Sequence, residues 1–183
     1  MKDYVFVNYG EEKGFIDKAK KLGFEELVLV FNTKEVKLLS LELLESYQAE
    51  GFRVYFGVLL EQSLNVPVFV EEKIGLGTKI SSLWNGLTAI YYNEFLEEKD
   101  GLHERRAGLN HVSMAECKEK GVNVLFGYAD LFNEEKKPQK LGRAMQNKKL
   151  CVKKGVKWDL CSMAKTPREM RNAVDARALR ELL

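Results

Sequence analysis

The stretch KLGRAMQNKKLCVKKGVKWDLCSM, residues 140–163, indicates the fold most directly. A helical pattern runs from Lys140 to Lys154 and stops at Gly155, a residue type that commonly ends helices. Directly after it, Lys157–Met163 is a short apolar run of the kind that forms a buried strand. A similar run, Val122–Phe126, precedes the helix. A strand, a helix and a second strand in this order predict a parallel βαβ unit.

The same alternation extends along the rest of the chain. Further apolar runs, mostly continuous and rich in valine and aromatic residues, are predicted to be strands covered on both faces: Tyr4–Val7, Leu27–Phe31, Arg53–Val58, Val66–Val70 and Thr88–Tyr92. Further helices are predicted over Glu12–Leu22 and Asn110–Lys120. Another is predicted to start at the capping residues Asn32, Thr33 and Glu35 and to end at Gly51. The last is predicted to start at Thr166, with Pro167 at N1 and Glu169 at N3. The pattern therefore predicts an α/β fold.

Periodicity leaves the closure of the sheet open. About seven strands are countable, and residues 71–87 or 93–104 have room for an eighth. A barrel of eight βα units usually needs a longer chain, so a compact barrel and a doubly wound sheet both fit. With 183 residues, 45% of them hydrophobic, and no internal repeat or linker, the chain is predicted to be one domain over residues 1–183.

Several functional classes find no support in the sequence. No apolar stretch approaches the ~20 residues of a membrane span, and MKDYVFVNYG reads as a strand and not as a signal peptide, so a cytoplasmic protein is predicted. The three cysteines are odd in number and widely spaced, which indicates reduced thiols. Only two histidines, His103 and His111, are present, which excludes a histidine-rich metal cluster. Neither HExxH nor GxSxG occurs.

Charge is divided unequally between the two parts of the chain. Residues 1–100 hold 11 basic and 17 acidic residues, a net charge of 11 − 17 = −6, whereas residues 101–183 hold 18 and 10, a net charge of 18 − 10 = +8. Such asymmetry predicts a polyanion contact in the C-terminal part.

The helix over Lys140–Lys154 is the centre of that positive charge. Nine lysines or arginines and no acidic residue lie between Lys136 and Lys157. A turn of 100° per residue is expected to place Leu141, Ala144, Met145, Cys151 and Val152 on one side of the helix, and Arg143, Gln146, Asn147, Lys153 and Lys154 on the other. Such a cationic outer face, without acidic partners, suits a phosphate backbone.

A second basic motif is HERRAGLNHV, residues 103–112. Arg105 and Arg106 are the residue type that grips phosphates bidentately, and Asn110 is placed to cap the next helix. His111 in the first turn is a candidate hydrogen-bond donor to phosphate or base. Arg168, beside Pro167, is expected to join the same rim, and all these sites are expected at the carboxyl edge of the sheet.

Three segments, taken together, resemble one family. RRAGLNHVSMAECKEKGVNVLF (105–126), RAMQNKKLCVKKGVK (143–157) and CSMAKTPREM (161–170) occur in the order and at the spacing of ribonuclease P protein component 3, the thirty-kilodalton-type subunit of archaeal and eukaryotic ribonuclease P. The resemblance covers about 40% of the chain, at its C-terminal end. Where Met163 stands, the family usually has glycine.

The resemblance implies a compact TIM-like (β/α) barrel related to PHP phosphoesterases, with fewer than eight regular units allowed by the strand count. It further implies an endonuclease holoenzyme, in which the RNA subunit with its bound magnesium removes the 5′ leader of precursor tRNA. The protein chain itself would be non-catalytic, would bind no cofactor, and would stabilise the RNA together with a small RRM-like partner subunit. The candidate RNA-binding residues are then Arg105, Arg106, Asn110, His111, Arg143, Asn147, Lys149, Lys153, Lys154 and Arg168.

Two other functions remain as alternatives. One is a small PHP-like phosphoesterase whose metal is held by Asp and Glu, with His103 as a further ligand. The other is a docking module whose acidic N-terminal part forms the main interface with a protein partner.

Overall fold

The computed structural model describes residues 1–48, 51–60, 66–77, 86–91, 107–133 and 137–183. Seven parallel strands form one sheet in chain order, and the strands are β1 (Lys2–Phe6), β2 (Glu26–Phe31), β3 (Arg53–Leu60), β4 (Val70–Leu76), β5 (Ala89–Tyr91), β6 (Asn123–Gly127) and β7 (Trp158–Cys161). The α-helices of the described residues are α1 (Glu12–Lys21), α2 (Leu41–Tyr47), α3 (His111–Lys120), α4 (Tyr128–Asn133), α5 (Lys137–Lys154) and α6 (Ala173–Leu182).

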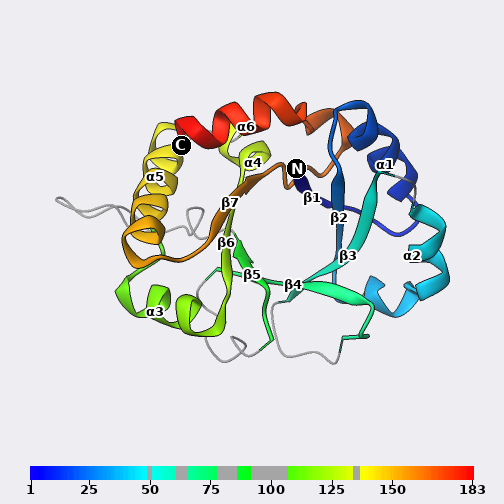
Figure 1. Cartoon of the computed structure of the whole chain (residues 1–183), viewed down its shortest axis with the longest axis horizontal. Coiled ribbons are helices and arrows are strands. Elements are labelled where there is room, and N and C mark those ends of the chain that lie inside the picture. Colours follow the sequence, from blue (N-terminus) through cyan, green and yellow to red (C-terminus); the bar gives the residue numbers. More distant parts are fainter. Residues whose placement is uncertain (49–50, 61–65, 78–85, 92–106, 134–136) are drawn as a thin grey trace.

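The sheet curls until its first and last strands meet. Val5 forms a parallel bridge with Ala164, which lies just beyond β7. Phe6 N–H donates to the Ala164 carbonyl at 2.9 Å, and Met163 N–H donates to the Tyr4 carbonyl at 2.8 Å. The helices lie outside the strands, with α1 and α2 beside the first strands and α3, α5 and α6 beside the last (Figure 1). In the described part of the chain, the fold is thus a nearly closed α/β barrel with fewer than eight units, as predicted, and not a doubly wound sheet.

The junction between β1 and β7 is called the seam here. Where strand pairing stops along this seam, carboxylates accept hydrogen bonds from backbone N–H groups. The Ser162 N–H donates to Asp3 Oδ1 at 2.6 Å, and the Leu160 N–H donates to Asp159 Oδ1 at 2.9 Å. The Ser162 hydroxyl donates to the Tyr4 carbonyl at 2.9 Å. An unpaired strand edge is costly when buried and prone to association when exposed. Side-chain acceptors here satisfy edge N–H groups that a further strand would otherwise pair.

Side chains alternate between the interior of the barrel and the layer beneath the helices. Such alternation follows from the twofold period of a strand. The interior is filled by one buried cluster, formed by Tyr4, Val28, Val30, Ile74, Ala89, Tyr91, Leu125, Cys161 and Met163. A larger cluster, which includes Phe31, Phe56 and Phe126, packs the outer faces of the strands against the helices.

The narrow interior requires glycine at two strand positions. A Cβ added at Gly57 would lie 2.9 Å from Val28 Cγ1, and one added at Gly127 would lie 2.9 Å from both Met163 Cβ and the Tyr91 hydroxyl. Barrel diameter falls with strand number, so seven strands leave little room for side chains inside. Glycine at these positions lets large neighbours fill the space.

The prediction of a strand over Val66–Val70 is wrong. The strand begins at Val70, and Val68 is 98% exposed. Polar residues in β4 interrupt the apolar pattern from which strands are predicted. One of them, Glu72, is paired in the fold, because it accepts hydrogen bonds from Lys2 and, at 3.3 Å, from the Tyr4 hydroxyl. A strand that carries charged residues at one end of a barrel lacks the continuous apolar run on which the prediction relied.

Two helix predictions are also corrected. Asn32 accepts from the Lys34 and Glu35 N–H groups, but only a 3-10 turn (Glu35–Leu38) follows, and α2 begins separately after Ser40. Thr166 and Glu169 form the predicted capping box, yet it caps a 3-10 turn over Pro167–Glu169, and α6 starts at Ala173. Capping signals identify where a helical turn starts and do not fix how far it extends.

The buried Asp3 makes a testable contribution to pH dependence. Asp3 is 1% exposed, and burial raises the pKa of its carboxyl to about 6 from an ordinary 3.8. Because the folded state holds this proton more tightly than the unfolded state, the contribution to stability is present below pH 4 and is lost as pH rises through 6. We expect Asp3→Asn, which removes this titration, to gain about 2–3 kcal/mol relative to wild type between pH 4 and pH 7. Denaturant unfolding at both pH values measures the difference, and a constant difference would contradict the assignment.

Met163 tests the balance between backbone strain and packing. It is fully buried and has a left-handed φ of 47°, the conformation that glycine adopts without strain. We expect Met163→Ala to lose about 2–5 kcal/mol, because it removes packing and keeps the strained backbone. Met163→Gly is expected to be more stable than Met163→Ala by about 1 kcal/mol. Thermal and chemical unfolding of both variants checks the order, and the reverse order would exclude strain at this residue.

Candidate nucleic-acid interface

Asn110 caps α3 as the sequence predicts. Its Oδ1 accepts from the N–H groups of Val112 and Ser113, each at 2.9 Å, and the Ser113 hydroxyl accepts from the Asn110 N–H at 2.9 Å. The two residues therefore form a reciprocal capping box. Since Asn110 occupies two N–H groups of the first turn, this terminus offers fewer free donors to an anion than the sequence suggested.

His111 is the first residue of α3 and lies exposed at its N-terminus. Gly108, just before the cap, has a φ of 85°, a value that favours glycine. Arg105, Arg106 and His103 lie outside the described residues, so their candidacy stays a prediction from the sequence.

The inward face of α5 differs from the prediction. Arg143, Ala144, Asn147 and Cys151 are all buried, with exposures of 3% or less. Asn147 Nδ2 donates to the Ala107 carbonyl at 2.7 Å, and Cys151 Sγ lies 3.8 Å from Met114 Sδ of α3. Arg143 and Asn147 were expected on the solvent side, and that orientation is wrong. Asn147 instead joins α5 to the segment that leads into α3.

The outward face of α5 combines lysines with apolar residues. Leu141, Met145 and Val152 were predicted to be buried but are 38%, 37% and 61% exposed. The prediction that these residues are buried relied on their hydrophobicity alone. A small residue, however, allows a helix to lie closer to the strands that it covers. Ala144 permits close approach to the barrel, and the neighbouring polar residues Arg143 and Asn147 are carried inward with it.

The lysines near the end of α5 are accessible. Lys149 and Lys153 are exposed, and Lys154 is half-buried. Together with Lys148 and Val152, Lys149 and Lys153 border a shallow depression of about 280 Å³. Successive residues four apart lie on one side of a helix, so Lys149 and Lys153 present two cations to the same surface.

The candidate cations divide between the two ends of the barrel. Because β6 and β7 are parallel, α5 runs antiparallel to them and carries Lys149–Lys154 to the amino end of β7. Arg168 is exposed in the turn after β7, at the carboxyl end of that strand. His111 and Arg168 therefore lie at the carboxyl edge, as expected, whereas the direction of the connecting helix moves the lysines of α5 to the opposite edge.

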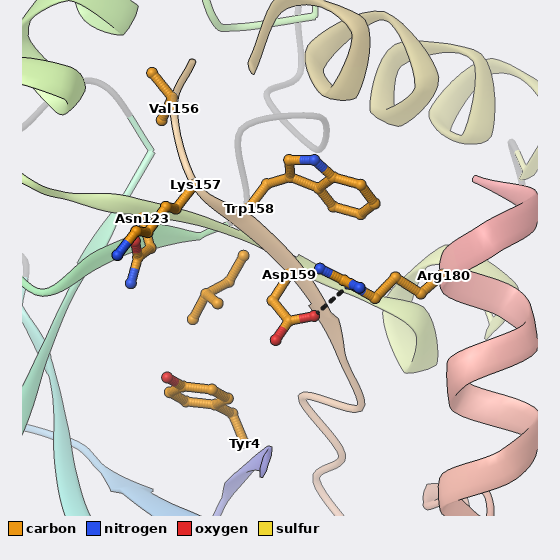
Figure 2. Close-up of a pocket in the computed structure, with 8 residues that line it drawn as sticks. Tyr4, Asn123, Val156, Lys157, Trp158, Asp159 and Arg180 are labelled. Carbon is orange, nitrogen blue, oxygen red and sulfur yellow. Dashed lines mark ion pairs between the residues drawn. The ribbon is translucent and has the colours of Figure 1, made fainter. Parts of the chain in front are cut away.

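The amino edge also carries a cavity beside the β1–β7 seam. Its volume is about 410 Å³, and Tyr4, Asn123, Trp158, Asp159 and Arg180 are among the residues that line it (Figure 2). Asp159 Oδ1 and Arg180 Nε form an ion pair at 2.9 Å. Lysines, an aromatic ring and a carboxylate thus gather at one end of the barrel.

At the carboxyl edge, the carboxylate of Asp130 is already paired. Asp130 accepts from the Tyr91 hydroxyl and, at 3.1 Å, from Lys165 Nζ. The described residues contain no group of three or more His, Cys, Asp or Glu side chains that could hold a metal ion. All three cysteines are buried free thiols, as predicted, and burial raises the pKa of Cys117 to about 12, which makes it a poor nucleophile at neutral pH.

Comparison with known proteins identifies the fold. No protein-family model and no curated sequence matches the chain. A chain of the cryo-EM structure of archaeal ribonuclease P with mature tRNA superposes with a TM-score of 0.70 at 17% sequence identity. The alignment covers 100% of this chain and 82% of that chain. The described part of the chain has no helix that is both long and apolar enough to cross a membrane.

Asn147 and Lys149 provide a matched pair for testing the orientation of α5. Asn147→Ala removes a buried hydrogen bond and leaves the Ala107 carbonyl without its donor, so we expect a loss of about 1–3 kcal/mol in unfolding free energy. Lys149→Ala changes an exposed residue two positions away and is expected to stay within about 0.5 kcal/mol of wild type. Equal losses in urea unfolding would contradict this orientation.

Proposed function

We propose that this chain is a protein subunit of an archaeal-type ribonuclease P, which binds and stabilises the catalytic RNA for removal of the 5′ leader of precursor tRNA. The observation that carries the proposal is the full-length superposition on a chain of an archaeal ribonuclease P structure. Three ordered sequence motifs and a C-terminal part with a net charge of +8 support it independently.

RNA contact is assigned to exposed groups, and the buried groups position them. His111, Lys149, Lys153 and Arg168 are exposed and offer hydrogen-bond donors or positive charge to phosphate. Lys154 is half-buried next to Lys153 at the end of α5. Arg143, Asn147 and Asn110 shape the surface from within: Asn147 fixes α5 against the segment before α3, and Asn110 fixes the start of α3. Arg105 and Arg106 are proposed as further contacts on sequence grounds.

The proposed division of labour leaves bond cleavage to the RNA. Magnesium held by the RNA subunit would supply the metal chemistry, and the protein would need no cofactor of its own. The PHP-like phosphoesterase is not favoured, since the described residues bring no metal-ligand group together. In this proposal the protein works in the cytoplasm and contacts precursor tRNA only through the assembled particle.

A protein partner is proposed beside the RNA. The acidic N-terminal part, with a net charge of −6, would be the docking side for a small RRM-like subunit. Pull-down of that subunit with and without the RNA separates direct docking from an RNA bridge. Capture that requires RNA would remove this interface from the proposal.

Reconstitution tests the function directly. The RNA and the other protein subunits are combined with and without this chain, and cleavage of precursor tRNA is measured at limiting magnesium. We expect the chain to lower the magnesium concentration that half-maximal cleavage requires, because bound lysines reduce the repulsion between RNA phosphates. Identical magnesium dependence in both mixtures would disprove a subunit role.

Salt dependence tests the lysines of α5. The measured quantity is the slope of log K, with K the RNA-binding constant, against log salt concentration. We expect the double variant Lys149→Ala, Lys153→Ala to reduce the magnitude of this slope by about 0.7–0.9 for each phosphate that the variant no longer neutralises. Lys13→Ala, Lys37→Ala, which removes two exposed lysines from the acidic part, is the matched control and should retain the wild-type slope. Equal slopes for both double variants would remove α5 from the RNA interface.

A further inference from the structure

We propose that the cavity at the β1–β7 seam binds one unstacked nucleotide and favours a base that carries an exocyclic amine. The inference rests on the proposed function for the source of that nucleotide, an RNA strand.

The cavity exists because the barrel closes incompletely. Among the described residues, β1 and the end of β7 pair only near Val5 and Ala164, so the amino end of β7 is open toward β1. The resulting space of about 410 Å³ falls within the range of ordinary small-ligand pockets. Figure 2 shows Tyr4 and Asp159 on one side of β7 and the Trp158 ring on the other, with Arg180 reaching in from α6.

The aromatic residues suit a planar base. Trp158 is half-buried, and its ring meets Phe126 edge to face at 6.0 Å between centroids, which fixes its position. Lys148 Nζ and Arg180 Cζ lie 5.4 Å and 5.0 Å from the Trp158 ring centroid. Base stacking on aromatic and guanidinium groups is the general means by which proteins hold single-stranded nucleotides.

Asp159 supplies the selectivity. Its Oδ1 forms an ion pair with Arg180 Nε at 2.9 Å and accepts a hydrogen bond from the Leu160 N–H at 2.9 Å, whereas none of the described residues donates a hydrogen bond to Oδ2. The Asp159 side chain is 44% exposed. A carboxylate oxygen accepts from the amine of cytosine, adenine or guanine, but uracil presents a carbonyl at the corresponding position. Asp159 therefore discriminates against uracil.

The charges around the cavity suit the phosphate of the nucleotide. Lys157 and Arg180 line the cavity together with the single carboxylate Asp159, and Lys148 lies against the adjacent tryptophan. Three cations against one anion leave a local excess of positive charge. Lys149 and Lys153 continue this surface along α5, so a strand that crosses them would reach the cavity.

If Asp159 served only to hold β7 against α6, its variants would behave differently in the nucleotide titration. The Asp159–Arg180 pair joins β7 to α6, but both side chains are nearly half-exposed, at 44% and 46%. Exposed ion pairs contribute little to stability. A brace would make Asp159 variants less stable without any effect on the choice of nucleotide.

Nucleotide titration of the full-length protein tests the proposal. CMP and UMP are added to 15N-labelled protein, and the resonances of the Trp158 indole and the Asn123 amide are followed. We expect CMP to bind about tenfold more tightly than UMP, because the pair differs at the amine that Asp159 accepts. Asp159→Asn should bring the two affinities within about threefold of each other. Asp17→Asn, an exposed change on α1, is the control and should keep the wild-type ratio.

Three outcomes overturn the proposal: equal affinities for CMP and UMP, shifts confined to residues away from the cavity, or an unchanged ratio in Asp159→Asn. Trp158→Phe keeps a ring against Phe126 and should weaken CMP binding while the protein stays folded. The titration is separable from the reconstitution assay. Stimulated cleavage without CMP selectivity removes this site alone, and CMP selectivity without stimulated cleavage removes the subunit function alone.

Discussion

The contact between Asp3 and the Ser162 N–H is the interaction on which the barrel depends. Seven parallel strands leave two edges, and the first and last strands meet over a short length only. The Asp3 carboxylate satisfies an edge N–H just below the bridge between Val5 and Ala164, at a place where the bond is fully buried. This closure has a cost, because burial disfavours the ionised form of the Asp3 carboxyl group.

The incomplete closure of the barrel leaves a cavity beside the seam. The same seam that Asp3 closes near Ser162 remains open near Asp159, where α6 covers it through Arg180. The narrow interior, packed around Gly57 and Gly127, leaves little room for a central ligand of the kind that wider barrels hold. A ligand of the described part of the chain would therefore meet the rim or the seam.

The direction of α5 determines where the positive charge lies. A helix between two parallel strands must return to the amino edge, so its last turns carry Lys149 and Lys153 away from His111 and Arg168. An RNA that contacts all four residues would span the height of the barrel. A compact ligand would instead meet one end only, and the lysine-rich amino end has a cavity beside it.

The sequence by itself determined the α/β class, the parallel direction of the strands, the Asn110 cap and the charge asymmetry, because each depends on local pattern or composition. The tertiary structure alone decided the closure of the sheet, the limits of β4 and the orientation of α5. Hydrophobicity predicted that Leu141 is buried and that Asn147 faces solvent, whereas packing reversed both. The reason is physical: a buried amide is stable once a distant carbonyl, that of Ala107, accepts its hydrogen bond, and no local pattern contains that partner.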